Sequence, residues 1–283
     1  MPADPLPLTG KRVVTIALNA PGPMAAERLR DLGAAVIKVE PPAGDPLARF
    51  SPRWYADLVR GVKVEKCDLK TMPGQAHMYA LLEGADVLLT SQRPTALPRL
   101  GIGWNDLHAR FPRLCQVALV GYPPPRHNAA GHDLTYLAAN GLLQPPRLPP
   151  TLYADVAASE RAAFAALAVL LERERTGAGQ YMEIALADTA ARLAAPLRAG
   201  LTAEGAILGG GYPGYNLYRT QDGWVAVAAL EPRFYERLCQ RLGVAEPSYE
   251  RFAERFASET NEYWSRFAED NDLPVEPVAE APD

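Results

Sequence analysis

The first 120 residues alternate between short apolar runs and segments with helical spacing. Val13 to Leu18 is a run of apolar and β-branched residues, which is typical of a buried strand. Polar and apolar positions from Met24 to Leu32 recur at helical spacing, and Gly33 follows them as a stop signal. The predicted strands are residues 13–18, 35–40, 85–89 and 115–120, and the predicted helices are residues 24–32, 75–83 and 105–110. This rhythm predicts an α/β fold, a Rossmann-like parallel sheet flanked by helices, with ligands at the carboxyl ends of the strands.

The middle of the chain predicts two further helices. One is residues 134–140, between proline-rich connections. The other is residues 159–175, where Phe164, Leu167, Ala168 and Leu171 share one predicted face. The apolar run at 181–186 fits either a strand or a helix.

After about residue 187 the composition changes. Residues 215–219 and 224–228 flank an Asp222–Gly223 turn and predict a hairpin. Helices are expected at 232–242 and 248–270, the second with Phe252, Phe256, Trp264 and Phe267 on its apolar side. We therefore predict a large domain at 1–190, a linker at 191–210 and a smaller α+β domain at 211–283.

Charge and cysteine content narrow the function classes. The net charge of −4 argues against bulk electrostatic binding to nucleic acid. The three cysteines form no paired framework, so a reducing, cytoplasmic setting is expected. No apolar run reaches the roughly 20 residues that a membrane-spanning helix needs. No nucleic-acid or membrane partner is predicted.

Several blocks of the sequence, in a fixed order, resemble one family. They include APGPMAAERLRDLGAAVIKVEPPAGDP from residue 20, CDLK at 67–70, RPTALPRLG at 93–101, GHDLTYLAANGLL at 131–143 and ALEP at 229–232. Together they resemble the class III coenzyme A transferase family, which includes formyl-CoA transferase, carnitine CoA-transferase and the α-methylacyl-CoA racemases. The GHD and ALEP blocks look most like the racemase branch.

The resemblance implies a set of catalytic residues. His132 and Asp155 match the racemase His and Asp that flank the substrate α-carbon, and Glu231 matches the partner of the His. A racemase of a 2-methylacyl-CoA needs one base and one conjugate acid on opposite faces of that carbon. Backbone N–H groups near residue 156, at a helix start, are candidate donors to the enolate oxygen.

Other interpretations stay open. Asp155 is the nucleophile if the protein is a CoA-transferase working through an aspartyl anhydride. A non-catalytic CoA-binding or partner subunit of the same family is the third possibility. Locally, His132 and Asp155 also suit helix caps, and Glu231 suits a helix start.

The resemblance further implies a coenzyme A site and no metal. The CoA phosphates require cations and backbone donors. Lys38 is favoured among the cations because it ends a strand at the ligand edge of the sheet. The expected CoA-binding residues are Ala20, Pro21, Lys38, Leu69, Lys70, Arg93 and Arg99.

Two departures from the family pattern bear on the site and the assembly. The family's glycines after the Asp are replaced by Val156, Ala157, Ala158 and Ser159, whose β-carbons are expected to narrow the acyl pocket. The sequence ends soon after LPVEPV at 273–278, before the segment that interlocks the family's dimers. A homodimer is expected, with interlocking open and a hetero-oligomer as the alternative.

Overall fold

The computed structural model describes residues 5–280 and divides the chain into two compact units, Met1–Ala194 and Ala195–Asp283. The first unit has a parallel sheet flanked by helices, and the second has a small antiparallel sheet with helices. The predicted α/β fold class is confirmed. The division falls after Ala194, and residues 191–210, predicted as a linker, contain the end of one helix, all of a second and most of a short helical turn at 207–211.

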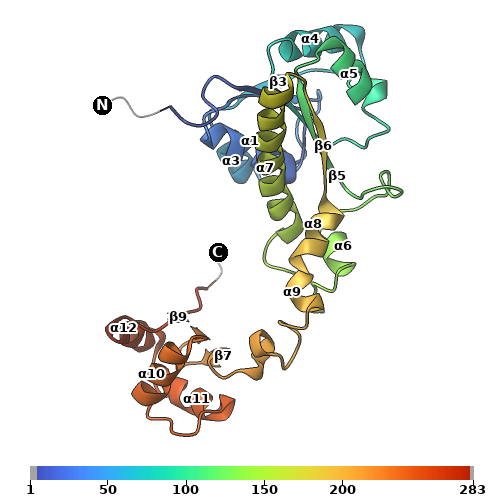
Figure 1. Ribbon diagram of the computed structural model, residues 1–283. Helices are drawn as coiled ribbons and strands as arrows, with labels where there is room; N and C mark the ends of the chain where they lie inside the picture. Colours follow the sequence, from blue (N-terminus) through green and yellow to red (C-terminus); the bar gives the residue numbers. More distant parts are fainter. Residues whose placement is uncertain (1–4, 281–283) are drawn as a thin grey trace. The chain divides into compact units, whose positions relative to one another are not determined.

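The first unit is built on six parallel strands (Figure 1). The sheet has the order β3-β2-β1-β4-β5-β6, so the chain reverses its direction of winding between β1 and β4. In doubly wound folds this reversal leaves a crevice at the carboxyl ends of the two central strands. The strands are β1 (Arg12–Thr15), β2 (Ala35–Glu40), β3 (Lys63–Lys66), β4 (Val87–Thr90), β5 (Cys115–Val120) and β6 (Tyr181–Ala185).

Helices cover both faces of this sheet, as the apolar strands predict. Alternate strand residues such as Val13 and Val117 pack beneath α1 (Pro21–Asp31) and α7 (Tyr153–Thr176), while Val14 and Leu88 pack beneath α4 (Met72–Leu82) and α5 (Trp104–Arg110). The remaining helices of this unit are α2 (Leu47–Phe50), α3 (Pro52–Leu58), η1 (Pro98–Leu100), α6 (Asp133–Ala138) and α8 (Leu186–Leu193).

Helix α7 corrects one prediction. Its buried face consists largely of alanines, among them Ala158, Ala162 and Ala166, which let it pack closely on α1 and β5. Phe164 and Leu171, predicted on a shared apolar face, are 74% and 76% exposed. Helical spacing alone does not distinguish a stripe of small buried residues from a stripe of large exposed ones. Neither α7 nor any other described helix is long and apolar enough to cross a membrane.

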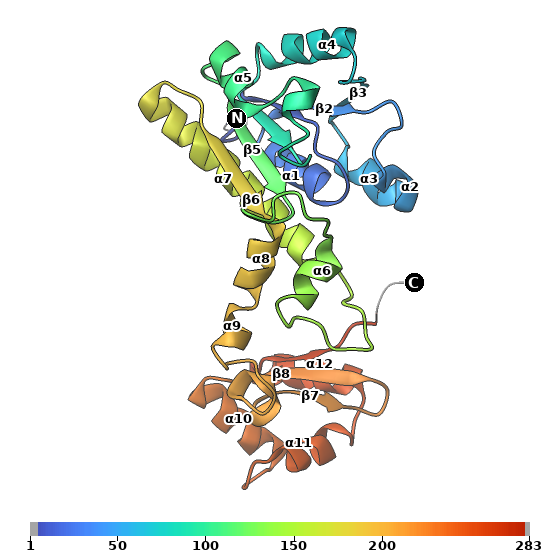
Figure 2. The same cartoon turned by 90° about the vertical axis from the view of Figure 1, so that its right-hand side faces the viewer.

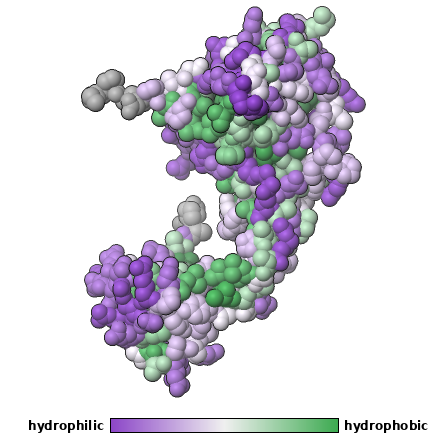
Figure 3. Space-filling model, in the orientation of Figure 1, coloured by the Kyte–Doolittle hydropathy of each residue, from purple (hydrophilic) through white to green (hydrophobic). Residues whose placement is uncertain are grey.

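The second unit packs its helices against a three-stranded sheet (Figure 2). The predicted hairpin is present, and β9 (Val275–Pro277) adds a third antiparallel strand. The predicted 248–270 helix is two helices, because Thr260 caps a new one by accepting the Tyr263 amide. The core is aromatic, with Tyr218, Phe252 and Trp264 buried, while the helical side is hydrophilic on the face seen in Figure 3. The elements are α9 (Ala195–Arg198), η2 (Ile207–Gly211), β7 (Tyr215–Arg219), β8 (Trp224–Ala228), α10 (Pro232–Leu242), α11 (Tyr249–Phe256), α12 (Asn261–Asn271) and β9 (Val275–Pro277).

Candidate active site

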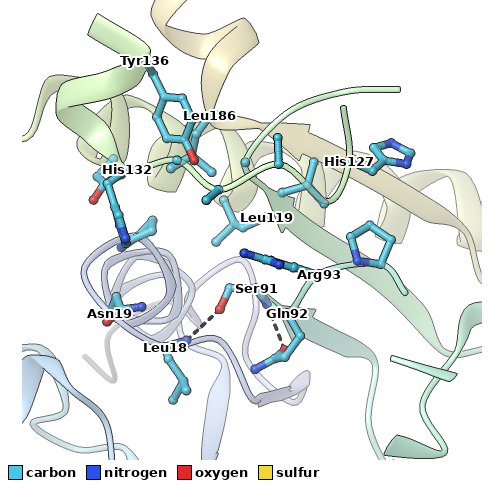
Figure 4. Close-up of a pocket in the computed structure, with 18 residues that line it drawn as sticks. Leu18, Asn19, Ser91, Gln92, Arg93, Leu119, His127, His132, Tyr136 and Leu186 are labelled. Carbon is cyan, nitrogen blue, oxygen red and sulfur yellow. Dashed lines mark hydrogen bonds between the residues drawn. The ribbon is translucent and has the colours of Figure 1, made fainter. Parts of the chain in front are cut away.

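A pocket of about 250 Å³ opens at the carboxyl edge of the large sheet. It lies where β1 and β4 end, at the reversal of strand order, and it extends to the ends of β5 and β6 (Figure 4). The lining residues come from six segments: Leu18, Asn19, Pro21, Ser91, Gln92, Arg93, Pro94, Leu119, Val120, Gly121, His127, Ala129, Ala130, Gly131, His132, Tyr136, Asp155 and Leu186.

Side chains after β4 hold the floor of the pocket together. The Leu18 amide donates to Ser91 Oγ at 2.9 Å, and Gln92 Nε2 donates to the Ile16 carbonyl at 2.8 Å. Gly22 allows α1 to start directly above β1, since a Cβ there would lie 2.5 Å from Ala17 Cβ. The turn after β1 is therefore fixed against β4.

His132 precedes α6 and contributes its ring to the pocket. Its main chain begins the helix, because its amide donates to Thr135 Oγ1 at 3.0 Å and its carbonyl accepts from that hydroxyl at 2.8 Å. The ring extends toward the side of the pocket that carries Asn19 (Figure 4). Gly131 is required beside it, since a Cβ would lie 2.6 Å from the Tyr136 ring. His132 thus occupies the helix-cap position that was predicted as the local alternative, and it places its imidazole in the pocket as well.

Asp155 lies in the first turn of α7 and lines the same pocket as His132. Burial, reinforced by the nearby charge of Asp133, raises the pKa of Asp155 to about 7 from its ordinary value near 3.8. At neutral pH this carboxyl is therefore present in both protonation states. A group in that condition is suited to accept and return a proton.

Asp133 caps α7 from outside the helix, a role that no pattern in the sequence indicated. Its buried Oδ1 accepts from the Ala154 amide at 2.7 Å and from the Asp155 amide at 3.0 Å. The Val156 amide donates to the Leu152 carbonyl at 2.9 Å. These bonds correct the expectation that amides near residue 156 stabilise an enolate, since all three are engaged within the protein.

Only some of the other predicted site residues lie at this pocket. Pro21 and Arg93 line the pocket, and Ala20 is buried next to Pro21. Glu231 is exposed and precedes α10 in the second unit. Three predicted CoA contacts lie elsewhere in the first unit, partly or fully exposed and outside the pocket lining: Leu69 and Lys70 after β3, and Arg99 in η1.

Lys38 is the clearest correction among the predicted CoA-binding residues. Its side chain is 1% exposed, and its ammonium lies 2.8 Å from Asp45 Oδ2 and donates to the Ala17 carbonyl at 2.8 Å. Glu40 Oε1 is a further 3.8 Å neighbour. A cation enclosed and neutralised in this way is not available to a nucleotide phosphate. Lys38 also lies inside β2 rather than at its end, since the strand continues to Glu40, and its side chain points into the protein.

The expected obstruction by the residues after Asp155 is not found. Ala158 and Ser159 are buried along α7, Val156 is exposed, and none of the residues 156–159 lines the pocket. His127, which was not among the predicted site residues, does line it.

The position of His127 follows from a contact that no local pattern reveals. Its Nε2 lies 3.2 Å from Glu183 Oε2, and Glu183 Oε1 accepts the Tyr181 hydroxyl at 2.5 Å. The contact places the loop that carries His127 beside β6.

Comparison with known proteins identifies the family. The profile of CoA-transferase family III matches residues 8–283. The chain belongs to CoA-transferase family III. The predicted resemblance is confirmed, and with it the prediction of an enzyme of this family.

Relatives in CoA-transferase family III carry both kinds of name that the sequence suggested. The alpha-methylacyl-CoA racemase of Homo sapiens is 32% identical over an alignment of 302 positions, gaps included, which covers 96% of this chain and 77% of that protein. The succinyl-CoA–D-citramalate CoA-transferase of Chloroflexus aurantiacus is 33% identical over 267 residues, covering 86% and 66%.

A solved structure of CoA-transferase family III shares the fold of this chain. The Mycobacterium tuberculosis protein Rv3272, named a probable fatty acyl-CoA transferase, is 30% identical over 290 residues, covering 90% of this chain and 74% of its own. Its crystal structure superposes with a TM-score of 0.85 over 98% of this chain and 85% of that one, at 29% identity. The family's use of acyl-CoA makes coenzyme A thioesters the substrates to test. In residues 5–280, no three His, Cys, Asp or Glu side chains are grouped as metal ligands.

Proposed function

We propose that the protein racemises or epimerises the α-carbon of a 2-methylacyl-CoA by proton transfer between His132 and Asp155. The observation that carries this proposal is that both side chains line one pocket at the ligand edge of the sheet. The raised pKa of Asp155, about 7, supports it because a conjugate acid must be protonated at working pH.

The two residues have complementary tasks. The His132 imidazole, which carries a basic nitrogen, removes the α-proton on one face, and the protonated Asp155 delivers a proton to the other face. For the opposite enantiomer, Asp155 starts as carboxylate and His132 as imidazolium. We further propose Glu231 as a catalytic residue, a role that the resemblance alone supplies.

Coenzyme A is the proposed carrier of the acyl group. Arg93 lines the pocket and provides a cation for the phosphates or the thioester end of the ligand. Leu69, Lys70 and Arg99 are proposed contacts for the nucleotide. The protein is proposed to act as a homodimer in the cytoplasm.

The test is α-proton exchange in heavy water. Each enantiomer of a 2-methylacyl-CoA is incubated with the protein, and deuterium incorporation and inversion are followed by mass spectrometry and chiral chromatography. We expect deuterium at the α-position and a common racemic end point. The proposal is contradicted if one or both enantiomers take up no deuterium at the α-position.

Matched variants assign the exchange to the pocket. His132→Ala is expected to lower the exchange rate by roughly a hundredfold or more while acetyl-CoA binding persists. His77→Ala is the control, because His77 is an exposed histidine on α4 whose ring contacts Glu65. Unchanged exchange in His132→Ala contradicts the assignment.

A CoA-transferase is the second candidate, favoured by the transferases among the relatives and by the ionised fraction of Asp155 at neutral pH. An Asp155 oxygen would attack the thioester carbonyl, forming an acyl-aspartyl anhydride as the C–S bond breaks and CoA leaves as thiolate. Mixing an acyl-CoA with an isotopically labelled carboxylic acid tests this, because only a transferase moves CoA onto the labelled acid.

A further inference from the structure

The enclosed charge of Lys38 has no obvious reason in the packing of the sheet. It lies in β2 between strands β1 and β3, where most inward positions are apolar. Removing a charge from water is unfavourable unless it is paired, and an apolar side chain of similar size packs in such a place at least as well. A buried pair is therefore expected to have a task besides stability.

The contacts of the pair converge on one short turn. Lys38 donates to the Ala17 carbonyl, and Asp45 Oδ1 accepts from the Asn19 amide at 3.0 Å. The same oxygen accepts from the Leu47 amide at 2.9 Å, which holds Asp45 in place. The two charged side chains thus hold both ends of the segment 17–19, directly after β1.

This turn needs support because its backbone is strained. Asn19 has a φ of 62°, in the left-handed region that residues other than glycine rarely adopt. From the other side, Ser91 accepts the Leu18 amide. Leu18 and Asn19 then form the pocket wall toward which the His132 ring extends (Figure 4).

We propose that Lys38 and Asp45 are positioning residues, which fix the Ala17–Asn19 turn so that Leu18 and Asn19 form the wall of the pocket opposite His132. They touch no substrate and act through the main chain of the turn. Their effect on catalysis rests on the proposed function, whereas their effect on the turn and on ligand binding does not.

The test replaces the pair by neutral residues of similar size. Lys38→Met alone leaves Asp45 buried without its partner and is expected to fold poorly. The double variant Lys38→Met/Asp45→Asn removes both charges and keeps an oxygen for the Asn19 amide. Glu40 loses the same cation but still accepts from the Tyr55 hydroxyl and from the amide of residue 45, so the variant is expected to fold, with a melting temperature about 4–8 °C below that of wild type.

The matched control is a second ion pair in the same unit, in which the cation is buried and the carboxylate is partly exposed. Arg173 Nη2 lies 2.7 Å from Asp86 Oδ1, at the amino ends of β4 and β5, and neither residue lines the pocket. The control variant is Arg173→Met/Asp86→Asn.

Two readouts separate positioning from stability. In the Lys38→Met/Asp45→Asn variant, hydrogen exchange of the peptide containing Leu18 and Asn19 is expected to accelerate at least tenfold, with weaker binding of acetyl-CoA. The kcat for α-proton exchange is expected to fall roughly tenfold or more at saturating substrate. In the control, all three quantities stay within about twofold of wild type.

Two outcomes overturn the proposal. One is that the double variant shows the same amide hydrogen exchange and the same acetyl-CoA binding as the wild-type protein. The other is an equal loss in both variants, which would show a general role in stability. If the wild-type protein exchanges no α-proton, the proposed function fails, and amide exchange with acetyl-CoA binding still decides the role of the pair.

Discussion

Replacing Asp155 by asparagine is expected to stabilise the protein at high pH while removing its chemistry. Burial and the charge of Asp133 disfavour the carboxylate at this position, which is why the pKa of Asp155 rises to about 7. Asparagine has a similar shape and no charge to bury. The variant therefore removes an unfavourable interaction that the wild-type protein retains for function.

The sign and size of the effect follow from proton linkage. Between pH 4 and pH 7 the unfolded chain loses the Asp155 proton while the folded protein keeps it, so wild-type stability falls as pH rises. The pKa rises by about three units at about 1.4 kcal/mol each, which gives about 4 kcal/mol for a fully enclosed group. Asp155 is partly exposed, and solvent screening reduces the expected gain to about 2 kcal/mol at pH 8.

The assay is urea unfolding of wild type and Asp155→Asn at pH 4 and pH 8, followed by circular dichroism. Every other group titrates in both proteins, so the pH dependence of their difference isolates Asp155. We expect a small difference at pH 4 and a more stable variant at pH 8, with α-proton exchange abolished. A difference that is the same at both pH values would refute the argument from burial.

Three further predictions test other parts of the account. Asp133→Asn keeps an oxygen for the Ala154 and Asp155 amides but removes a negative charge, so the pKa of Asp155 in the pH profile of kcat/KM should fall below about 7. Asp133→Ala should in addition lower the melting temperature, because it removes the cap of α7. Gly131→Ala should lower kcat for exchange roughly tenfold or more at saturating substrate, because the new Cβ would clash with the Tyr136 ring and displace the main chain that carries His132. Ala162→Leu should destabilise the protein by about 1–3 kcal/mol in urea unfolding, whereas Phe164→Ala should cost less than about 1 kcal/mol; the reverse order would contradict the observed face of α7.

Four of the six strands of the large sheet were predictable from their sequence pattern, whereas β3 is short, charged and largely exposed and was not predicted, and the run at β6 left strand and helix open. Buried parallel strands are continuous apolar runs, and Val13, Val36 and Val117 lie inside such runs. Helix α7 was harder. Its alanine stripe has little weight in a pattern dominated by large side chains, so the exposed Phe164 and Leu171 were assigned to the wrong face.

Some residues of the candidate site were likewise predictable and others were not. His132 and Asp155 were found because they belong to recognisable sequence blocks, and the structure places them in one pocket. Asp133 and Lys38 act through partners distant in sequence, Asp133 on Asp155 and Lys38 on Asp45 and Ala17. Whether a charged side chain faces solvent or is enclosed depends on such partners, which one sequence does not reveal.

The most direct measurement of the central claim is a crystal structure with a bound 2-methylacyl-CoA. The account predicts the α-carbon between the His132 imidazole and the Asp155 carboxyl, about 3–4 Å from each. A thioester whose carbonyl carbon, rather than its α-carbon, faces Asp155, or an acyl group bound away from both residues, would contradict it.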